Sequence, residues 1–368
     1  MSERPVNRQE NLSWLAELSP WPAEFGLGRM RELLASLGDP QRSYEAVHVV
    51  GTNGKTSTTL MTAALLQSAG RRAGAYISPH VRGWAERIQI DGEEADLDAA
   101  LGRVRPQAEG ATQFEVLTAA ALAEFAARDV DVAVVEAGLG GRHDATNVLG
   151  ARVVVLTNVA LEHTDVLGDT REVIAVEKLA VVTPGSHVVL GEPEWEAQAR
   201  EAGAATVELV SGSNLALAVA AAAAILGEPV DPAAAERVVV PGRLERRSEH
   251  PLEIWDGAHN LAGIGYLLGR LPGRDYTIVT SILADKSAGE MLRALTALGG
   301  TLVATESQNP RAIPVAELAA LAEPHFARVE QNPDPSAAVR RARELAGPDG
   351  AVLVTGSLYL LAALSLDG

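Results

Sequence analysis

The sequence contains no cysteine among its 368 residues, and aromatic residues make up only 4% of it. Without cysteine there can be neither a disulfide framework nor thiolate chemistry, which agrees with a reducing compartment such as the cytoplasm. The scarcity of aromatic residues, beside abundant alanine, valine and leucine, favours helices packed on buried parallel strands. A hydrophobic content of 47% excludes a disordered chain.

Positive charge is also scarce, because 31 lysines and arginines face 48 aspartates and glutamates and the formal net charge is −17. A protein without a basic surplus cannot readily displace counterions from nucleic acid, so nucleic acid is not expected as a partner. Any anionic substrate must instead be attracted locally, by individual lysines or arginines, by a metal ion or by a helix dipole.

Long hydrophobic runs are missing as well. The longest, from Leu215 to Leu226, falls short of the roughly 20 residues that a membrane-spanning helix needs. The N-terminal stretch MSERPVNRQENLSW lacks the apolar centre of a signal peptide. The sequence therefore predicts a cytoplasmic protein without a membrane partner.

What the sequence does contain is a regular alternation of strand and helix patterns. Strands are expected at residues 46–50, 73–77, 87–90, 131–135, 152–156 and 187–190. Helices are expected at residues 97–104, 114–127, 171–179 and 213–226, besides one directly after the first strand. Strands that alternate with helices imply a doubly wound, mostly parallel sheet that binds ligands at the carboxyl ends of its strands.

The chain is long enough for two domains, and VVVPGR at residues 238–243 has the composition of a linker. Beyond it, strands are expected at residues 252–255, 276–280, 301–305, 327–330 and 351–355. The predicted fold class is therefore α/β with two domains. Residues 1–240 would form a P-loop-containing, mostly parallel sheet flanked by helices, and residues 241–368 a smaller Rossmann-like α/β domain.

The strongest single motif is VVGTNGKTS at residues 49–57, between an apolar strand and a helical pattern. Its glycines allow backbone N–H groups to converge on a phosphate, and the helix N-terminus adds positive potential. Lys55 would reach the outer phosphates, and the hydroxyl of either Thr56 or Ser57 would face a magnesium ion. The motif is not a strict Walker A sequence, because Val49 occupies the place of its first glycine.

Two isolated polar residues follow other predicted strands. Glu136 precedes the glycine-rich GLGGR segment and occupies the place of a magnesium-organising carboxylate, although a solvated loop carboxylate has the same pattern. His163 also follows a strand end. Magnesium prefers oxygen ligands, so a histidine ligand would imply a site of specialised geometry.

Weaker signals come from Lys178 and from the DGAHN segment at residues 256–260. Taken alone, Lys178 has the pattern of an ordinary exposed lysine on a helix. The DGAHN segment is equally typical of a strand-to-helix turn in which Asn260 caps the helix.

Together, these motifs resemble the dihydrofolate synthase/folylpolyglutamate synthase family of the Mur ligase superfamily. The resemblance runs in the family's order from residue 26 to residue 360, through GLGRM, VVGTNGKTSTT, YISPHVRGWAERIQIDG, FEVLTAAAL, VVEAGLGGRHDATNV, LEHTDVLGDTREVIAVEK, PGRLE, WDGAHN, ADKS, NPRAIP and TGSLYL. The SPH, ERI, GGRxDATN and DGAHN elements favour the folate branch over the muramoyl-peptide branch.

The resemblance implies an ATP-dependent ligase that joins L-glutamate to dihydropteroate or to the terminal glutamate of a reduced folate. The substrate carboxylate attacks the γ-phosphate of ATP and gives an acyl phosphate and ADP. The amine of L-glutamate then attacks the acyl carbon and expels phosphate. Because a carboxylate and a triphosphate repel each other, two magnesium ions and Lys55 would have to neutralise their approach.

The resemblance also implies a role for individual residues. Contacts with ATP would come from Thr52, Asn53, Gly54, Lys55, Thr56, Ser57, Asn214, Arg243 and Asp256. Magnesium would be held by Ser78, Glu136, His163 and Lys178, the last as a carbamate. Catalytic roles would fall to Lys55, Lys178 and His259. The pteroate or folate would contact Leu27, Gly28, Arg29, Phe114, His143, Asp144 and Ala145.

Some features depart from the family pattern and keep alternatives open. The GKT of the loop is more typical of muramoyl-peptide ligases, so Thr56 could take the role otherwise expected of Ser57. A muramoyl-peptide ligase is the first alternative, although the separate N-terminal domain expected for its uridine-nucleotide substrate is not seen before the loop. A P-loop nucleotide-binding protein without ligase chemistry is the second. We expect a monomer, and the motifs do not distinguish dihydrofolate synthesis from polyglutamylation.

Overall fold

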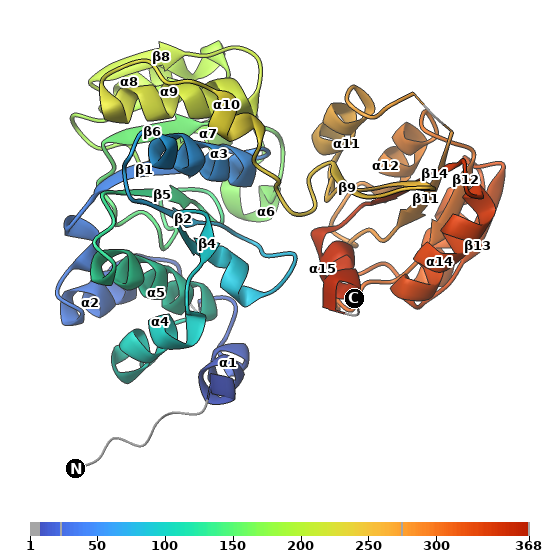
Figure 1. The fold of residues 1–368 in the computed structure, drawn as a ribbon, viewed down its shortest axis with the longest axis horizontal. Coiled ribbons are helices and arrows are strands. Elements are labelled where there is room, and N and C mark those ends of the chain that lie inside the picture. Colours follow the sequence, from blue (N-terminus) through green and yellow to red (C-terminus); the bar gives the residue numbers. More distant parts are fainter. Residues whose placement is uncertain (1–7, 23, 274, 367–368) are drawn as a thin grey trace. The chain divides into compact units, whose positions relative to one another are not determined.

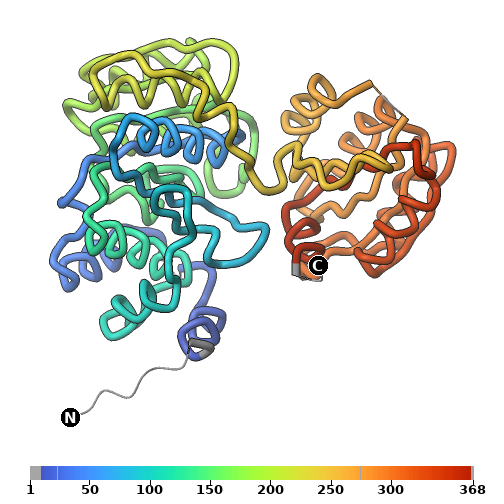
Figure 2. The backbone as a smooth tube through the Cα atoms, in the orientation of Figure 1, coloured from blue at the N-terminus to red at the C-terminus, as the bar shows by residue number. Residues whose placement is uncertain are grey.

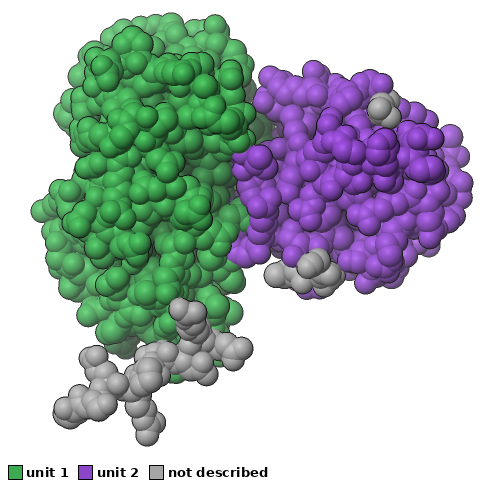
Figure 3. All heavy atoms as spheres, in the orientation of Figure 1, with its two compact units in different colours: residues 1–78, 84–238 green, residues 79–83, 239–368 purple. Residues whose placement is uncertain are grey.

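Two sheets organise the chain, one in each of two units (Figure 1). The computed structural model describes residues 8–22, 24–273 and 275–366. Unit 1 comprises residues 1–78 and 84–238, and unit 2 comprises residues 79–83 and 239–368 (Figure 3). The short segment 79–83 is thus assigned to unit 2 although the residues on either side of it belong to unit 1, and Figure 2 traces the backbone by colour in sequence order.

The sheet of unit 1 has eight strands in the order β4-β3-β2-β5-β1-β6-β7-β8. The strands are β1 Glu45–Val50, β2 Ala73–Tyr76, β3 Ile88–Ile90, β4 Glu93–Glu94, β5 Val132–Glu136, β6 Val153–Leu156, β7 His187–Leu190 and β8 Thr206–Leu209. β2, β5, β1, β6, β7 and β8 run parallel, and β3 and β4 add an antiparallel edge. The inner strands are short apolar runs because both faces of the sheet are covered.

The helices of unit 1 cover both faces of this sheet. They are α1 Arg8–Glu17, α2 Gly28–Ser36, α3 Lys55–Ser68, α4 Leu97–Val104, α5 Gln113–Ala127, α6 Thr164–Leu167, α7 Arg171–Leu179, α8 Glu196–Glu201, α9 Asn214–Leu226 and α10 Ala233–Glu236. Short 3-10 helices span Pro40–Arg42, Trp84–Arg87, Arg105–Gln107 and Pro193–Trp195. α3 packs against α9, while α5 packs against α2 and α4 (Figure 1). The phosphate loop thus precedes a helix that is well supported on the sheet.

The sheet of unit 2 has six strands in the order β13-β12-β11-β14-β10-β9. They are β9 Glu245–Glu249, β10 Leu252–Trp255, β11 Tyr276–Thr280, β12 Thr301–Ala304, β13 Arg328–Gln331 and β14 Ala351–Thr355. Only β9 pairs antiparallel with its neighbour. The helices of this unit are α11 Leu261–Leu268, α12 Ala288–Leu295, α13 Val315–Ala322, α14 Pro335–Ala346 and α15 Leu358–Leu366.

The α/β fold class predicted from the sequence is confirmed, including the mostly parallel character of both sheets. The sequence did not indicate α8, β8 or β9. β8 lies at a sheet edge and three of its four residues are exposed, so it lacks the apolar run that marks a buried strand. In the described part of the chain, none of the helices combines the length and the apolar character needed to cross a membrane.

Candidate phosphate and metal site

The loop after β1 has a backbone that favours glycine at two positions. Gly51 and Gly54 have φ angles of 149° and 84°, in the region that side-chain-bearing residues seldom adopt. A Cβ atom at Gly51 would collide with the side chain of Thr157, and one at Gly54 with the side-chain amide of Asn214. Asn214 therefore lies directly against the loop.

Two lysine ammonium groups bind carbonyl oxygens of this loop. Lys55, the first residue of α3, donates from Nζ to the carbonyls of Gly51 and Thr52, both at 3.1 Å. Lys178 Nζ donates to the same Gly51 carbonyl at 2.8 Å. Hydrogen bonds between an ammonium and a phosphate are stronger than those to a neutral carbonyl, so a bound phosphate would compete for Lys55.

Lys178 is only 4% exposed, contrary to the pattern of an ordinary surface lysine. Burial, reinforced by the nearby charge of Lys55, lowers the pKa of Lys178 to about 7. The helix that carries it approaches the glycine-rich segment so closely that a Cβ atom at Gly141 would lie 2.7 Å from the carbonyl oxygen of Glu177. The amine of Lys178 is thus held beside the phosphate loop with a substantial neutral fraction near pH 7.

Glu136, the last residue of β5, joins two other residues predicted to belong to the site. Its Oε1 accepts a hydrogen bond from Thr56 Oγ1 at 3.0 Å, and its Oε2 accepts one from the backbone N–H of Ser78 at 3.1 Å. The structure therefore brings Thr56, Ser78 and Glu136 together. Ser57, the alternative to Thr56, is buried in α3.

His163 occupies the N-cap position of α6 with a left-handed backbone, and its Nε2 lies 3.8 Å from Glu162 Oε1. Within residues 8–22, 24–273 and 275–366, no group of three or more His, Cys, Asp or Glu side chains is arranged to hold a metal ion. A metal site here would have to use hydroxyl groups, oxygens of the ligand or a modified lysine in addition to Glu136.

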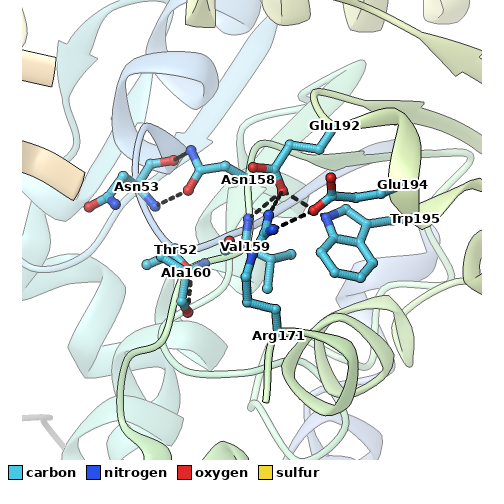
Figure 4. A network of polar contacts seen from close by, with 9 residues as sticks. All are labelled: Thr52, Asn53, Asn158, Val159, Ala160, Arg171, Glu192, Glu194 and Trp195. Atoms are coloured by element: carbon cyan, nitrogen blue, oxygen red, sulfur yellow. Dashed lines mark hydrogen bonds and ion pairs between the residues drawn. The ribbon is translucent and has the colours of Figure 1, made fainter. Parts of the chain in front are cut away.

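The segment after β6 anchors the phosphate loop, and it was not among the predicted site residues (Figure 4). The N–H of Thr52 donates to the carbonyl of Asn158 at 2.9 Å, and the N–H of Asn53 donates to Asn158 Oδ1 at 3.0 Å. Asn158 Nδ2 and Thr157 Oγ1 both donate to the Asn53 carbonyl, at 2.9 and 2.7 Å. A polar Thr-Asn pair directly after an apolar strand was the sequence signal that could have identified this anchor.

Asp144 supports the conformation of the glycine-rich segment. Its Oδ2 accepts from the Leu139 N–H at 2.8 Å, and its Oδ1 accepts from the Thr146 N–H at 3.0 Å. Burial raises the pKa of Asp144. Its neighbours differ, since Ala145 is buried and His143 is exposed. The structure therefore shows that Asp144 organises this loop, and the ligand contact implied by the resemblance stays a prediction.

The other residues predicted to bind a pterin lie on α2 and α5. Leu27 is the N-cap of α2, Gly28 is its first residue, and Arg29 forms an ion pair of 3.2 Å with Glu115 of α5. The ring of Phe114 lies against Gly138, because a Cβ atom there would be 2.6 Å from Phe114 Cζ. Phe114 is thus beside the segment that Asp144 organises.

In unit 2, the DGAHN segment forms a polar turn after β10. Asp256 is buried, and its two oxygens accept from the N–H groups of Leu244 and Ala258, both at 2.8 Å. Burial raises the pKa of Asp256, although the charge of Arg243 acts in the opposite direction. His259 Nδ1 lies 2.8 Å from the Gly257 carbonyl oxygen.

Asn260 caps α11 by accepting from the Gly263 N–H at 2.7 Å, as the turn pattern predicted. The structure also places Arg243, Asp256 and His259 near one another within unit 2. Arg243 Nη1 donates to the Gly242 carbonyl at 3.1 Å, and the Gly257 N–H donates to that same carbonyl at 2.8 Å.

The chain resembles known proteins over most of its length. Residues 49–223 match the family described as Mur ligase middle domain, and residues 242–358 match the family described as Mur ligase, glutamate ligase domain. The chain is 33% identical to the folylpolyglutamate synthase of Lacticaseibacillus casei, over 91% of this chain and 92% of that protein. It is 32% identical to the dihydrofolate synthase/folylpolyglutamate synthase of Mycobacterium tuberculosis, over 83% of this chain and 80% of that one.

Solved structures agree with these relatives. The Mycobacterium tuberculosis folylpolyglutamate synthase complexed with ADP superimposes with a TM-score of 0.89 at 30% identity, covering 98% of both chains. The E. coli FolC structure in complex with DHPP and ADP gives a TM-score of 0.89 at 27% identity, covering 100% of this chain and 99% of the other.

Proposed function

The chain belongs to the dihydrofolate synthase/folylpolyglutamate synthase family of Mur ligases, ATP-dependent enzymes, and we propose that it joins L-glutamate to the carboxylate of a pterin substrate through an acyl phosphate. The observation that carries this proposal is the convergence of four side chains on one glycine loop. Lys55 and Lys178 both bind the Gly51 carbonyl, and Thr56, the residue after Lys55 at the start of α3, donates to Glu136.

A carboxylate and the γ-phosphate of ATP carry like charges, so the site must offset their repulsion before the phosphoryl group can transfer. Lys55 supplies one positive charge at the start of α3, where the helix N-terminus and the loop N–H groups favour phosphate. Asn214 would contact the same nucleotide, and its position against Gly54 supports this role.

The residues around Glu136 fit a magnesium ion. The hydroxyl of Thr56 and the carboxylate of Glu136 are the oxygen ligands that magnesium prefers, and they lie 3.0 Å apart. Magnesium, when bound, would neutralise charge on the transferring phosphate. Thr56 is the better candidate of the two loop hydroxyls, because its side chain faces Glu136 whereas Ser57 is buried. Ser78 and His163 stay predictions as further ligands.

Lys178 fits the proposed carbamate for two reasons. Carbon dioxide reacts with a neutral amine, and a pKa of about 7 leaves much of the Lys178 amine neutral at physiological pH. In the reaction the neutral nitrogen forms a bond to the carbon of carbon dioxide and releases one proton, which converts the amine into a carbamate with an anionic oxygen ligand. Such a ligand would help to hold a second metal ion, since among the residues that the structure describes no three His, Cys, Asp or Glu side chains are arranged to hold one.

Other assignments rest on the family resemblance and stay part of the proposal. In unit 2, Arg243 and Asp256 would contact the nucleotide and His259 the reacting phosphate. In unit 1, Phe114 and the start of α2 would contact the pterin. We also propose a monomeric, cytoplasmic enzyme, which size-exclusion chromatography and cell fractionation would test.

The relatives carry both activity names, so dihydropteroate and a reduced folate are both candidate acceptors. We expect phosphate release from ATP only when L-glutamate and one of these acceptors are present together. Assays of each acceptor separately, with and without magnesium, test this expectation. Absence of turnover with both acceptors would contradict the folate assignment, and turnover with a muramoyl peptide would support the alternative branch of the superfamily.

A further inference from the structure

The anchor of the phosphate loop is itself held by a second set of contacts, which no step of the proposed reaction uses (Figure 4). The anchor is the segment 157–160 that follows β6. Besides the bonds of Thr157 and Asn158 described above, the Ala160 N–H donates to Thr52 Oγ1 at 3.0 Å. The position of this segment therefore determines the direction in which the loop presents its N–H groups.

The backbone of one residue in the anchor, Val159, is bound at both its N–H and its carbonyl by the two members of an ion pair. The N–H of Val159 donates to Glu192 Oε2 at 2.9 Å, and the carbonyl of Val159 accepts from Arg171 Nε at 2.9 Å. Arg171 Nη2 and Glu192 Oε2 are themselves 3.1 Å apart. The arginine and the carboxylate thus bind each other and the two polar groups of a single residue.

Further contacts fix the orientation of this pair. Trp195 Nε1 donates to Glu192 Oε2 at 2.7 Å, and the guanidinium of Arg171 stacks over the Trp195 ring at 5.1 Å. Glu194 adds an ion pair of 2.6 Å with Arg171 Nη1. Glu192 Oε2 therefore accepts three hydrogen bonds and has a well-determined position.

These contacts are poorly suited to stabilising the whole fold. The side chains of Arg171 and Glu192 are 41% and 27% exposed, and exposed ion pairs contribute little to global stability. What they do fix is the orientation of the Val159 backbone, through its N–H and its carbonyl. Arg171 is also the first residue of α7, the helix that carries Lys178 near its other end. α7 thus contacts the phosphate loop directly, through Lys178 and the Gly51 carbonyl. It also contacts the anchor of that loop, through Arg171 and the Val159 carbonyl.

We propose that Arg171 and Glu192 are positioning residues, which hold segment 157–160 so that the loop at residues 51–54 has the correct shape for nucleotide phosphates. The inference rests on the proposed binding of ATP by this loop. Loss of Arg171 or Glu192 weakens nucleotide binding and leaves the affinities for the pterin and for L-glutamate unchanged.

The test compares Arg171→Met and Glu192→Ala with the wild-type protein. We measure the Kd of AMPPNP by calorimetry, the KM values of all three substrates and the melting temperature. Loss of a charge-assisted hydrogen bond to Val159 should raise the Kd and the KM for the nucleotide about tenfold. Glu192→Gln keeps an acceptor oxygen for Val159 and should recover part of the affinity.

Glu194→Ala is the matched control, because it removes an ion pair of Arg171 but no bond to Val159. Arg200→Ala removes the exposed pair with Glu196 on α8 and controls for loss of surface charge. Both should bind AMPPNP as the wild type does. Equal nucleotide affinity in wild type, Arg171→Met and Glu192→Ala would overturn the positioning role, as would equal losses in Glu194→Ala. A wild-type protein that binds no nucleotide would instead contradict the proposed function.

Discussion

Lysine is rare in this chain, and two of its three lysines lie at the phosphate loop. Arginine supplies most of the 31 basic residues, and lysine occurs only at positions 55, 178 and 286. Lys55 and Lys178 both bind the Gly51 carbonyl. Arginine remains protonated at any ordinary pH, whereas a buried lysine can lose its proton and react. Of the two basic residues, only lysine can therefore form the carbamate proposed for position 178.

We predict that Lys178→Met abolishes turnover while the protein remains folded, because methionine fits a buried site but cannot form a carbamate. Native mass spectrometry in bicarbonate buffer should detect one added carboxylate group on the wild-type protein and none on the variant. Lys286→Met is the matched control, since Lys286 pairs with Asp285 in unit 2 and should be dispensable for the modification. Full turnover by Lys178→Met would contradict the carbamate.

The buried His48 on β1 leads to a prediction of how the stability of the protein depends on pH. Its Nε2 lies 2.8 Å from Thr146 Oγ1, and burial lowers its pKa to about 3. An unfolded chain binds a proton at His48 below about pH 6.5, whereas the folded chain does so only near pH 3. The stability due to this difference is complete above pH 6.5 and is lost as the pH falls toward 3.

We therefore expect the free energy of unfolding of the wild type to decrease with falling pH more steeply than that of His48→Gln, by up to about 1.4 kcal/mol per pH unit. Urea denaturation between pH 4 and pH 7 measures the difference. His325→Gln, at an exposed histidine, is the matched control for the loss of one imidazole. Parallel curves for the wild type and His48→Gln would show that His48 is protonated in the folded protein.

At the scale of elements, helix α3 lies between two glycines with similar backbones and different surroundings. Gly54 before the helix has a φ angle of 84°, and Gly70 after it has a φ angle of 81°. A Cβ atom at Gly54 would displace the side chain of Asn214, whereas no atom lies within 4 Å of the same position at Gly70. Substitutions at the two glycines therefore distinguish two effects. Both would strain the backbone, but only a substitution at Gly54 would also disturb the phosphate loop.

We predict that Gly54→Ala and Gly70→Ala both destabilise the protein by about 1–2 kcal/mol, because both force alanine into a left-handed conformation. Only Gly54→Ala should also weaken nucleotide binding, by at least about tenfold, since Asn214 and the loop must move. Thermal denaturation and titration with AMPPNP measure the two effects. Equal nucleotide affinities in both variants would indicate that Asn214 does not shape the binding site.

Elements that lie inside a sheet were predictable from the sequence, and elements at its edge were less so. The apolar runs that became β1, β5 and β6 are buried on both faces, so composition alone marked them. β8 and β9 have mostly exposed side chains and carry no such run. The hydrogen-bond partners of the Asp144 and Asp256 carboxylates could not be predicted from the sequence. Only the folded loops bring backbone N–H groups to these oxygens.

At the scale of the molecule, the short segment 79–83 belongs to unit 2 although its neighbours in the sequence belong to unit 1. Val81 is 3% exposed and packs in the cluster that includes Trp255 and Leu361. Arg82 forms an ion pair of 3.0 Å with Glu245 at the start of β9. Part of the core of unit 2 thus comes from the amino-terminal part of the chain.

We predict that Val81→Ala destabilises unit 2 by about 2 kcal/mol through the cavity it leaves, with little effect on unit 1. Hydrogen exchange followed by mass spectrometry should show faster exchange in β10 and β14 and unchanged exchange in β5. Val130→Ala, in the core of unit 1, should give the opposite pattern. Faster exchange in β5 of the Val81→Ala protein would contradict the assignment of this segment to unit 2.

The sequence by itself determined the class of fold, the glycine loop with Lys55 and the family, because these depend on patterns that are local in the chain. Only the tertiary structure decided that Lys178 is buried, that Thr56 and not Ser57 faces Glu136, and that Arg171 and Glu192 hold the loop anchor. Each of these depends on contacts between residues that are distant in sequence. The pKa of an amine and the direction of a hydroxyl follow from the surroundings that folding creates.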